Sequence, residues 1–475
     1  MKRLVAWSHS MFAKGLVLLV VLLLLCIPLG QIESLIGARG QSANDAAREL
    51  AATYVGPQTL LGPLLQVPYV ERWQTIEHSE KEGRPDKVVE HSAEHVALLF
   101  PRQWSLDGEL TPEERYRGLF TVLFYRLSGA AQGSFAPFDA SQLPRGEKDS
   151  RLDIGTPVLT LRVSDLRGLQ GAPRLTVAGQ ELAFQRQADG LNPRNPLASG
   201  VHAPLSGTAL LAFRAGQPMP FTLDLTLLGQ QTLGVVPLGD DTDAHLRSSW
   251  PHPSFGGRFL AAERTVSEQG FDARWRIAAL TSQAREQLRE LAASTYAASS
   301  GIERLDRLDG VESFDVSFVQ PVNVYSMADR AVRYGFLFIA LTLMAVFMVE
   351  LFARLRLHPV QYTLVGLSIA VFFLLLIALS EKIGFAAAYA GAAGASVALL
   401  AAYFSAVLRS ARRALMLAGF VAILYAALYG LLASENNALL LGALLVFAML
   451  AALMLATRHT DWWALGRRDA DAEES

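Results

Sequence analysis

Apolar residues follow two different patterns along this chain of 475 residues. Long uninterrupted apolar runs occupy a stretch near the amino terminus and most of the chain after residue 330, whereas residues 33–330 contain short runs in which apolar and polar residues alternate. A helix needs about 20 mostly apolar residues to cross about 30 Å of hydrocarbon. The long runs therefore predict about six transmembrane helices, at 15–30, 334–351, 360–380, 385–408, 414–432 and 438–456.

The first apolar run has two interpretations. It is short and follows Lys2, Arg3 and Lys14, which also describes a secretory signal peptide. No A-x-A-like cleavage site follows Pro28, however, and apolar residues resume at Ile32. The sequence therefore favours an anchor helix that is not cleaved.

Basic residues next to the spans predict the orientation, because Lys and Arg in short loops are retained in the cytoplasm. With the amino terminus inside, the two short outer loops contain only Lys382. The inner segments hold eleven basic residues: Lys2, Arg3, Lys14, Arg354, Arg356, Arg409, Arg412, Arg413, Arg458, Arg467 and Arg468. The prediction is a cytoplasmic amino terminus (1–14), an anchor helix (15–32), a periplasmic domain (33–330), a five-helix bundle (331–457) and a cytoplasmic tail (458–475).

Four segments of the outer domain alternate apolar and polar residues with a period of two, at 159–163, 221–227, 271–277 and 314–318. This alternation is typical of antiparallel strands with one face on a core, and it predicts a large all-β, sandwich-like domain. Two helical segments interrupt the strands. Segment 42–54 places Ser42 three residues before Asp45, the spacing of a capping box, and segment 282–296 has Leu288 and Leu291 at helical spacing.

Composition narrows the possible functions. Hydrophobic residues make up 51% and charged residues 18% of the chain, and the formal net charge is -2, so nothing predicts a nucleic-acid partner. Cys26, the single cysteine, lies in the first apolar run, which leaves the outer domain without disulfides. The common hydrolase, zinc-protease and nucleotide-binding motifs are absent. We expect no catalytic residues and no cofactor.

The nearest approach to a metal-ligand cluster is Glu90, His91, Glu94 and His95. Histidines four apart suit a metal on a helix, but the flanking residues predict a strand. We therefore expect exposed polar surface and no metal site.

Segment 249–256 is the main candidate for a ligand or partner contact. Prolines on both sides of His252 impose an extended backbone, and Trp250 and Phe255 provide large apolar faces beside it. The alternative is a structural role, as a rigid edge or as a strand crossover anchored by the two aromatic side chains. Both interpretations remain open in the sequence.

Within the spans, ionisable residues are almost missing, with Glu350 and Glu381 at span ends. Ion-coupled transporters usually keep charges at mid-depth, so this scarcity argues against that class. Gly391 with Ala395, and Gly394 with Ala398, are interpreted as close helix packing. A transporter would instead need a continuous polar cavity, which could reach Ser368, Ser396 and Ser405.

The junction at 325–334 is the candidate for coupling the outer domain to the bundle, because it joins the last predicted strand to the second span. Asp329 and Arg330 would lie at the membrane interface, where a charge stays hydrated or paired, and Tyr334 suits the aromatic belt. Alternatively, Arg330 and Arg333 contact lipid phosphates and only mark the membrane edge.

Three long segments resemble the CreD family of bacterial inner membrane proteins: SSWPHPSFGGRFLAAERTVSEQGFDARW (248–275), NVYSMADRAVRYGFLFIALTLMAVF (323–347) and LHPVQYTLVGLSIAVFFLLLIALSEKIGF (357–385). The resemblance covers nearly the whole chain, with Ala261 departing from the proline typical of the family. It implies a Gram-negative inner membrane location and a link to cell-envelope integrity under a sensor kinase and response regulator, with ties to colicin tolerance and β-lactam response. It implies no catalytic residues.

The predicted function is a non-enzymatic envelope-stress protein of the inner membrane. Its partners would be the lipid bilayer and an envelope component or protein bound by the periplasmic domain. The alternative is a transporter or lipid-handling protein that works through the helical bundle.

Overall fold

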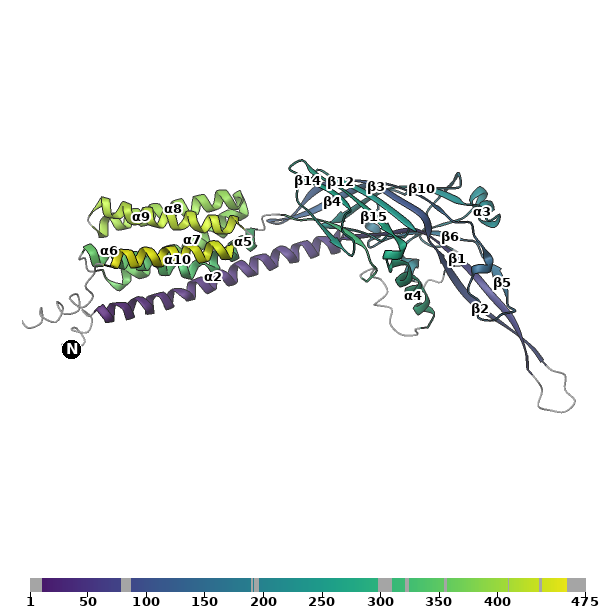
Figure 1. Ribbon diagram of the computed structural model, residues 1–475, viewed down its shortest axis with the longest axis horizontal. Helices are drawn as coiled ribbons and strands as arrows, with labels where there is room; N and C mark the ends of the chain where they lie inside the picture. Colours follow the sequence, from purple (N-terminus) through teal and green to yellow (C-terminus); the bar gives the residue numbers. More distant parts are fainter. Residues whose placement is uncertain are drawn as a thin grey trace, which may run out of the picture. The chain divides into compact units, whose positions relative to one another are not determined.

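The computed structural model describes residues 11–77, 87–188, 191, 196–297, 310–320, 324–353, 357–408, 410–434 and 438–458 (Figure 1). Two compact units are formed by the chain: Met1–Asn44 with Val322–Ser475, and Asp45–Pro321. We call them the helical unit and the two-sheet unit. Of the basic residues used to predict orientation, Lys2, Arg3, Arg354, Arg356, Arg409, Arg467 and Arg468 lie outside the described residues.

The two-sheet unit contains two eight-stranded sheets. The first sheet has the order β13-β16-β11-β1-β6-β9, with β2 and β5 also paired to β1. Its strands are β1 (Gln58–Glu77), β2 (Lys87–Leu99), β5 (Arg151–Ile154), β6 (Val158–Val163), β9 (Val201–Pro204), β11 (Thr232–Val235), β13 (Pro253–Gly257) and β16 (Phe314–Phe318).

The second sheet has the order β14-β15-β12-β3-β4-β10-β7-β8. Its strands are β3 (Pro101–Arg117), β4 (Phe120–Phe135), β7 (Arg174–Val177), β8 (Gln180–Leu182), β10 (Met219–Gln230), β12 (Asp241–Ser248), β14 (Glu263–Ser267) and β15 (Gly270–Ala278). The turn between β3 and β4 contains Gly118 at φ +60°, a left-handed conformation that glycine adopts without steric cost. Short 3-10 turns η1 (Ala140–Gln142), η2 (Leu166–Gly168), η3 (Pro196–Ser199) and η4 (Ala279–Thr281) connect strands of this unit.

The four predicted strands are confirmed as β6, β10, β15 and β16. Apolar side chains of both sheets share one core, which includes Leu161, Phe221, Trp275 and Phe314. The predicted antiparallel pairing holds for most neighbours, but both sheets are mixed, because β1 pairs with β11 and β3 pairs with β12 in parallel. Parallel neighbours need a long connection, and the chain provides it by crossing between sheets.

Two helices cover outer faces of the sheets. Helix α4 (Ala284–Ala297) confirms the predicted helix at 282–296, and its Ala284 and Leu288 pack on Leu61 of β1. On the second sheet, Leu50 of helix α2 (Met11–Thr53) lies against outward-facing Phe124 of β4. Since β4 is covered on both faces, its residues Val122 to Tyr125 are all buried and do not alternate. Helix α3 (Gly207–Arg214) lies between β9 and β10 in sequence.

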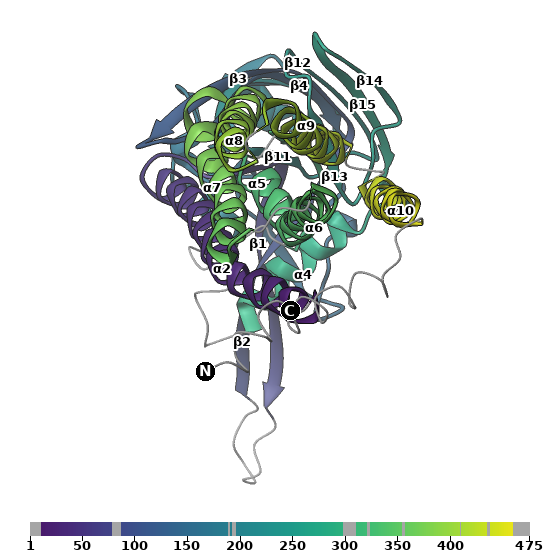
Figure 2. The ribbon, with the colours of Figure 1, turned by 90° about the vertical axis from the view of Figure 1, so that its left-hand side faces the viewer.

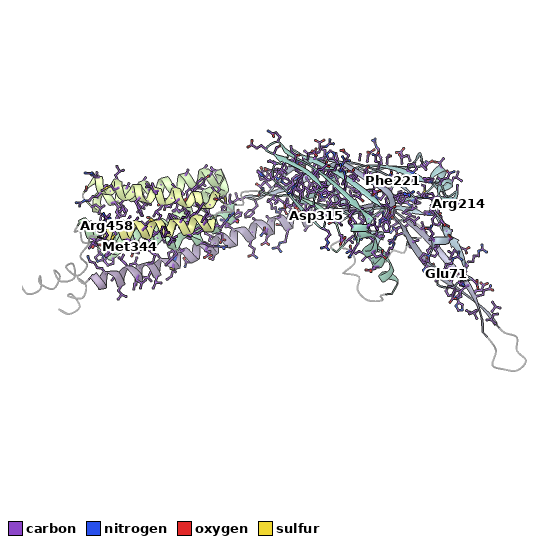
Figure 3. The ribbon with its side chains drawn as sticks, viewed as in Figure 1. Glu71, Arg214, Phe221, Asp315, Met344 and Arg458 are labelled. Atoms are coloured by element: carbon purple, nitrogen blue, oxygen red, sulfur yellow. The ribbon has the colours of Figure 1, made fainter. Side chains whose placement is uncertain are left out.

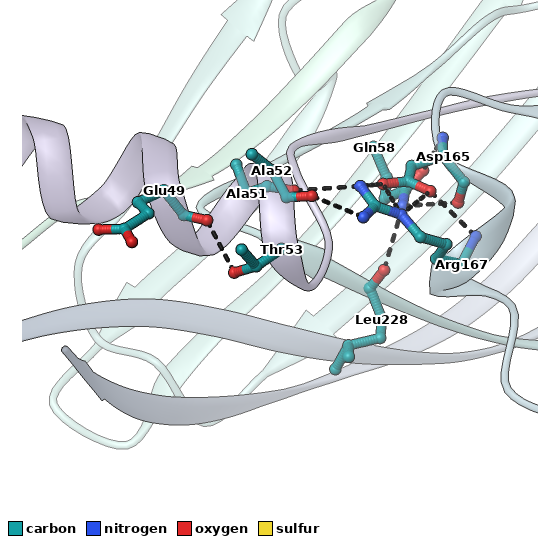
Figure 4. A network of polar contacts seen from close by, with 8 residues as sticks. All are labelled: Glu49, Ala51, Ala52, Thr53, Gln58, Asp165, Arg167 and Leu228. Atoms are coloured by element: carbon teal, nitrogen blue, oxygen red, sulfur yellow. Dashed lines mark hydrogen bonds and ion pairs between the residues drawn. The ribbon is translucent and has the colours of Figure 1, made fainter.

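The carboxyl end of α2 is held by an arginine (Figure 4). The Arg167 guanidinium donates to the carbonyl oxygens of Ala52 (2.7 Å) and Ala51 (3.2 Å), and it pairs with Asp165. Helix ends leave their last carbonyls without helical partners, and a cation there also suits the helix dipole. The chain following the helix then enters β1.

The predicted capping box at Ser42 is wrong. Helix α2 runs without interruption from Met11 to Thr53, so Ser42 lies inside it and its hydroxyl donates to the carbonyl of Ala38 at 2.9 Å. A serine inside a helix can satisfy its hydroxyl on the preceding turn. The predicted anchor and the helix at 42–54 are therefore one element.

The helical unit contains the first part of α2 together with α5 (Val324–Arg333), α6 (Gly335–Ala353), α7 (Pro359–Ile383), α8 (Phe385–Val407), α9 (Ala411–Ala433) and α10 (Ala438–Thr457). Figure 2 looks along these helices. Five described helices are long and apolar enough to cross a membrane, namely α2 and α6 to α9. In α10 the described apolar segment, Leu440–Ala452, is shorter than this test requires, so the predicted number of about six is not confirmed.

Helix α2 is part of the core of the helical unit. Val21, Leu25, Leu29, Ile32 and Ile36, spaced three or four residues apart along one face, are buried in the same apolar cluster as α5 to α9. A Cβ added at Gly366 of α7 would lie 2.1 Å from Leu25 Cδ1. The two helices approach closely at this glycine, which explains the need for a residue without a side chain there.

Candidate functional site

Segment 249–252 carries the chain from one sheet to the other. It follows β12, which lies inside the second sheet, and precedes β13, which forms an edge of the first sheet by pairing with β16. The structural interpretation of this segment, a strand crossover or a rigid edge, therefore agrees with the fold, which has a crossover at 249–252 followed by an edge strand, β13. Pro251 in the crossover and Pro253 at the start of the edge strand fit these positions, because proline has no N–H to donate to a neighbouring strand.

The aromatic side chains of the crossover point toward the core. Trp250 is half-buried, and its indole N–H donates to the carbonyl oxygens of His252 (3.1 Å) and Val319 (3.2 Å). Phe255 packs edge-on against Phe271 and Trp275, with ring centroids 5.6 and 5.8 Å away. His252 remains exposed. Of the three predicted contact residues, only His252 is exposed, and their role in binding stays a prediction.

Glu90, His91, Glu94 and His95 all lie on β2, as the strand prediction required. On a strand, residues four apart are separated by about 13 Å, so the two histidines cannot share one ion. His91 stacks on Trp73 and His95 stacks on Tyr69 across the hairpin with β1. Among the described residues, no group of three or more side chains could hold a metal ion.

The same hairpin contains a buried carboxylate that the sequence analysis did not identify. Glu71, labelled in Figure 3, lies on β1 and is 1% exposed. It accepts hydrogen bonds from the backbone N–H groups of Glu147 (3.0 Å) and Gly146 (2.9 Å). Ser150 Oγ donates to it at 2.5 Å, and His95 Nε2 lies 3.2 Å away. These donors, led by the Glu147 N–H and the Ser150 hydroxyl, lower the pKa of Glu71 to about 2.

The cradle around Glu71 binds a loop of this same chain. All its partners come from residues 146–150 and from the neighbouring strand. We interpret it as a structural site that fastens this loop to the hairpin. The chain separation of 75 residues between Glu71 and Gly146 explains why no local motif indicated it.

The junction predicted to couple domain and bundle forms a short helix. Asp329 and Arg330 lie on α5, where Asp329 pairs with Arg333, and Tyr334 follows between α5 and α6. The prediction that the last strand joins the span directly is wrong, because α5 intervenes and residues 321–323 lie outside the described part. Ala328, Ala331 and Val332 of α5 belong to the apolar core of the helical unit.

Charged residues at both ends of the helical unit pair across helices. Glu350 of α6 is 3% exposed, accepts from Lys14 Nζ of α2 at 2.7 Å and from the Tyr362 hydroxyl of α7, and also accepts from the backbone N–H of Leu357 (3.2 Å). Toward the other end, Glu381 of α7 lies 3.9 Å from Arg39 Nε of α2.

Tyr325 of α5 donates to Glu381 at 3.3 Å. Burial and the nearby Glu381 carboxylate raise the pKa of Tyr325 to about 12, so its hydroxyl stays protonated. The sequence placed both glutamates at span ends, but their partners are far apart in the chain and were not predicted.

The polar residues proposed for a transport path are separate in the structure. Ser396 Oγ lies 2.9 Å from the Tyr425 hydroxyl, whereas Ser368 and Ser405 donate to backbone carbonyls of their own helices, those of Val365 and Ala402. No described cavity joins the three serines.

The close-packing interpretation is wrong for Gly394. An added Cβ at this position would meet no atom within 4 Å. Gly394 instead lines a groove of about 490 Å³ between α8 and α9.

A second cavity, of about 540 Å³, lies in the two-sheet unit beside Arg162, Asp165, Arg167 and Arg186. Arg162 is buried and Arg167 is already paired with Asp165. None of the predicted contact residues lines either cavity.

Comparison with known proteins identifies the family. The family profile described as inner membrane protein CreD matches residues 10–463. The chain is 34% identical over 457 residues to the inner membrane protein CreD of Escherichia coli (strain K12), covering 96% of this chain and 95% of that protein. Among solved structures, an M1 zinc metallopeptidase from Deinococcus radiodurans aligns over 46% of this chain and 42% of its own, at 10% identity and a TM-score of 0.20, which is too low to carry an argument. The sequence resemblance is thus confirmed, and the chain belongs to the CreD family of inner membrane proteins.

Proposed function

We propose that this chain contributes to cell-envelope integrity and the envelope-stress response as a multi-pass inner membrane protein. In this proposal the two-sheet unit is periplasmic and both termini are cytoplasmic, in accord with the uneven distribution of basic residues. The two-sheet unit binds an envelope component, which we take to be a protein. The proposal assigns no catalysis, no cofactor and no nucleic-acid partner to the chain.

The observation that carries the proposed binding role is the difference between two edge strands. Strand β14, at an edge of the second sheet, is fully exposed and carries Glu263 and Arg264. Charges of this kind discourage pairing with another chain. Strand β13, at an edge of the first sheet, is Pro253, Ser254, Phe255, Gly256 and Gly257, without a charge. Since β13 pairs on one side with β16 and with no other described strand, its free edge suits an extended peptide segment.

The segment before β13 supports the same surface. The crossover 249–252 holds the start of β13 through the two hydrogen bonds of the Trp250 indole, while His252 stays exposed beside the edge. A preordered edge loses less conformational entropy on binding than a mobile one.

The test places a photoreactive amino acid at exposed Ser254 of the full-length protein in intact cells. A defined adduct with an envelope protein is expected, and Gly256→Lys should abolish it because a lysine on the edge blocks strand pairing. An added Cβ at Gly256 meets no atom within 4 Å, so the substitution fits. Thr265→Lys on β14 is the matched control. Failure to form an adduct at Ser254, or an adduct that Gly256→Lys and Thr265→Lys affect equally, would exclude β13 as the binding edge.

The second candidate function, a transporter or lipid-handling protein, is favoured by one observation, the groove between α8 and α9. The separation of Ser368, Ser396 and Ser405 described above removes the polar path that a transporter of polar solutes would use. Lipid handling is therefore the form of this candidate that the helical unit supports.

A further inference from the structure

The groove between α8 and α9 is lined by small side chains and by tyrosine rings. Its walls include Ala386, Gly394 and Val397 of α8 and Ala422 and Ala426 of α9. Outside the groove, Leu399 of α8 and Ile423 of α9 are large and 60% and 68% exposed, whereas the other exposed face of α8 is also small, with Ala387, Gly391, Ala395 and Ala398. The small side chains leave a channel along the line where α8 and α9 meet.

The length of the groove matches one leaflet of a bilayer. From Ala386 to Val397 a helix rises about 16 Å, which is close to half of the roughly 30 Å hydrocarbon thickness. Ala386 is the second residue of α8, and Tyr429 lies four residues before the end of α9. The groove therefore begins at one end of the two helices and stops near the middle of the span.

The width of the groove distinguishes a hydrocarbon chain from a helix. Its volume of about 490 Å³ spread over a length of about 16 Å corresponds to a cross-section of roughly 30 Å². A helix with its side chains is about 10–12 Å across, a cross-section more than twice as large. The space fits one extended alkyl chain, and a second helix could only rest on its rim.

The hydroxyl groups of Tyr389 and Tyr425 are hydrogen-bonded inside the helical unit, so the floor of the groove presents their rings. The Tyr389 hydroxyl donates to the Tyr425 carbonyl at 2.7 Å, and the Tyr425 hydroxyl lies 2.9 Å from Ser396 Oγ. The Tyr389 ring packs on Tyr429, with centroids 5.2 Å apart. Tyr429 is 39% exposed at the open end, and in the described part of the chain its hydroxyl has no hydrogen-bond partner. Tyrosines in this position relative to a span contact the lipid headgroup region.

We propose that the groove between α8 and α9 binds one acyl chain of a bilayer lipid, which enters from the leaflet at the end where α8 begins. The alkyl chain lies on the Tyr389 and Tyr425 rings and the small residues of both helices. The Tyr429 hydroxyl donates to an ester or phosphate oxygen of the same lipid. This inference rests on the membrane insertion of α8 and α9 and is independent of binding at β13.

The test uses the full-length protein in lipid nanodiscs that contain phosphatidylethanolamine with a photoreactive diazirine in the middle of one acyl chain. After illumination, mass spectrometry measures the labelling of 385–407 and 411–433. Gly394→Leu fills the groove where an added Cβ meets no atom, and leucine favours a helix more than glycine does. Ala390→Leu is a second filling variant. Ala395→Leu, exposed on α8 outside the groove, is the matched control.

We expect labelling of the groove residues to fall several-fold in both filling variants and to remain at the parent level in Ala395→Leu. Equal labelling in all four proteins would mean that only bulk lipid contacts these helices, and it would overturn the proposal. In a Cys26→Ser background, a disulfide between two copies of Gly394→Cys would show that a second copy occupies the groove, which would overturn it as well. Comparing the thermal unfolding of the filling variants with that of the parent verifies that they fold.

Discussion

The helical unit and the two-sheet unit each bury a carboxylate, but they stabilise its charge in different ways. Glu350, 3% exposed in the helical unit, has a formal counter-ion, because Lys14 Nζ lies 2.7 Å away. Glu71, 1% exposed in the two-sheet unit, is surrounded by backbone N–H groups and a serine hydroxyl. A histidine, His95, is its nearest basic side chain, and no Lys or Arg pairs with it in the described residues.

The difference follows from the surroundings of the two groups. Between packed helices few backbone N–H groups are free, since helices use their own, so a charge buried there needs partners among the side chains. A loop has free N–H groups and can fold around a carboxylate. The ion pair of the helical unit also joins α2 to α6 across 336 residues of chain, so it helps to determine where the first helix packs.

The largest effect is expected from Lys14→Met. Removing Lys14, whose side chain is 35% exposed, leaves the buried Glu350 without its cation, and we expect a loss of about 2 kcal/mol in unfolding free energy, between the cost of an exposed pair and that of a fully buried one. Thermal unfolding of the purified protein in nanodiscs measures it. Lys14→Met with Glu350→Gln should recover part of the loss, because the amide oxygen still accepts from the Tyr362 hydroxyl and the Leu357 N–H, and Lys382→Met, at an exposed position, is the control. An unchanged unfolding temperature in Lys14→Met would show that the ion pair does not stabilise the fold.

A smaller, pH-dependent effect is expected from Glu71→Gln. The pKa of this carboxyl is about 2 in the folded protein and near 4.5 when it is unfolded. Because the folded value is depressed, its contribution is present above pH 4.5 and is lost as the pH falls toward about 2. Urea unfolding at pH 7, 4.5 and 3 should show a flatter pH dependence in Glu71→Gln than in the parent. Glu90→Gln on the exposed side of the same hairpin should retain the parent dependence, and equal slopes in all three proteins would contradict the assignment.

The smallest effect is expected from Arg167→Ala, because this arginine is half-exposed and its contacts are screened by water. The unfolding temperature should change little, while hydrogen exchange in the last turn of α2 should accelerate once Ala51 and Ala52 lose their donor. Arg174→Ala, an exposed arginine nearby in the sequence, is the control. The role of Arg167 at the helix end would be rejected if both variants exchanged at the same rate.

Part of the candidate site was predictable from local chemistry. Prolines around His252 predicted a crossover or an edge, and the fold contains both, because proline restricts the backbone independently of its surroundings. The inward direction of Trp250 and Phe255 was not predictable. Their rings contact Phe318, Phe271 and Trp275, which lie on other strands.

From the sequence alone, four strands, β6, β10, β15 and β16, and the long apolar helices could be predicted, since periods of two and runs of about 20 apolar residues are local properties. The other strands of the two sheets were not predicted. Only the tertiary structure decided the parallel pairs β1 with β11 and β3 with β12, the continuous course of α2 through Ser42, and the burial of Thr160 and Arg162 on the polar face of β6. It also decided the partners of Glu71 and Glu350 and the open space at Gly394. Each of these depends on groups that are distant along the chain, and a local pattern contains no information about which distant surface will cover it.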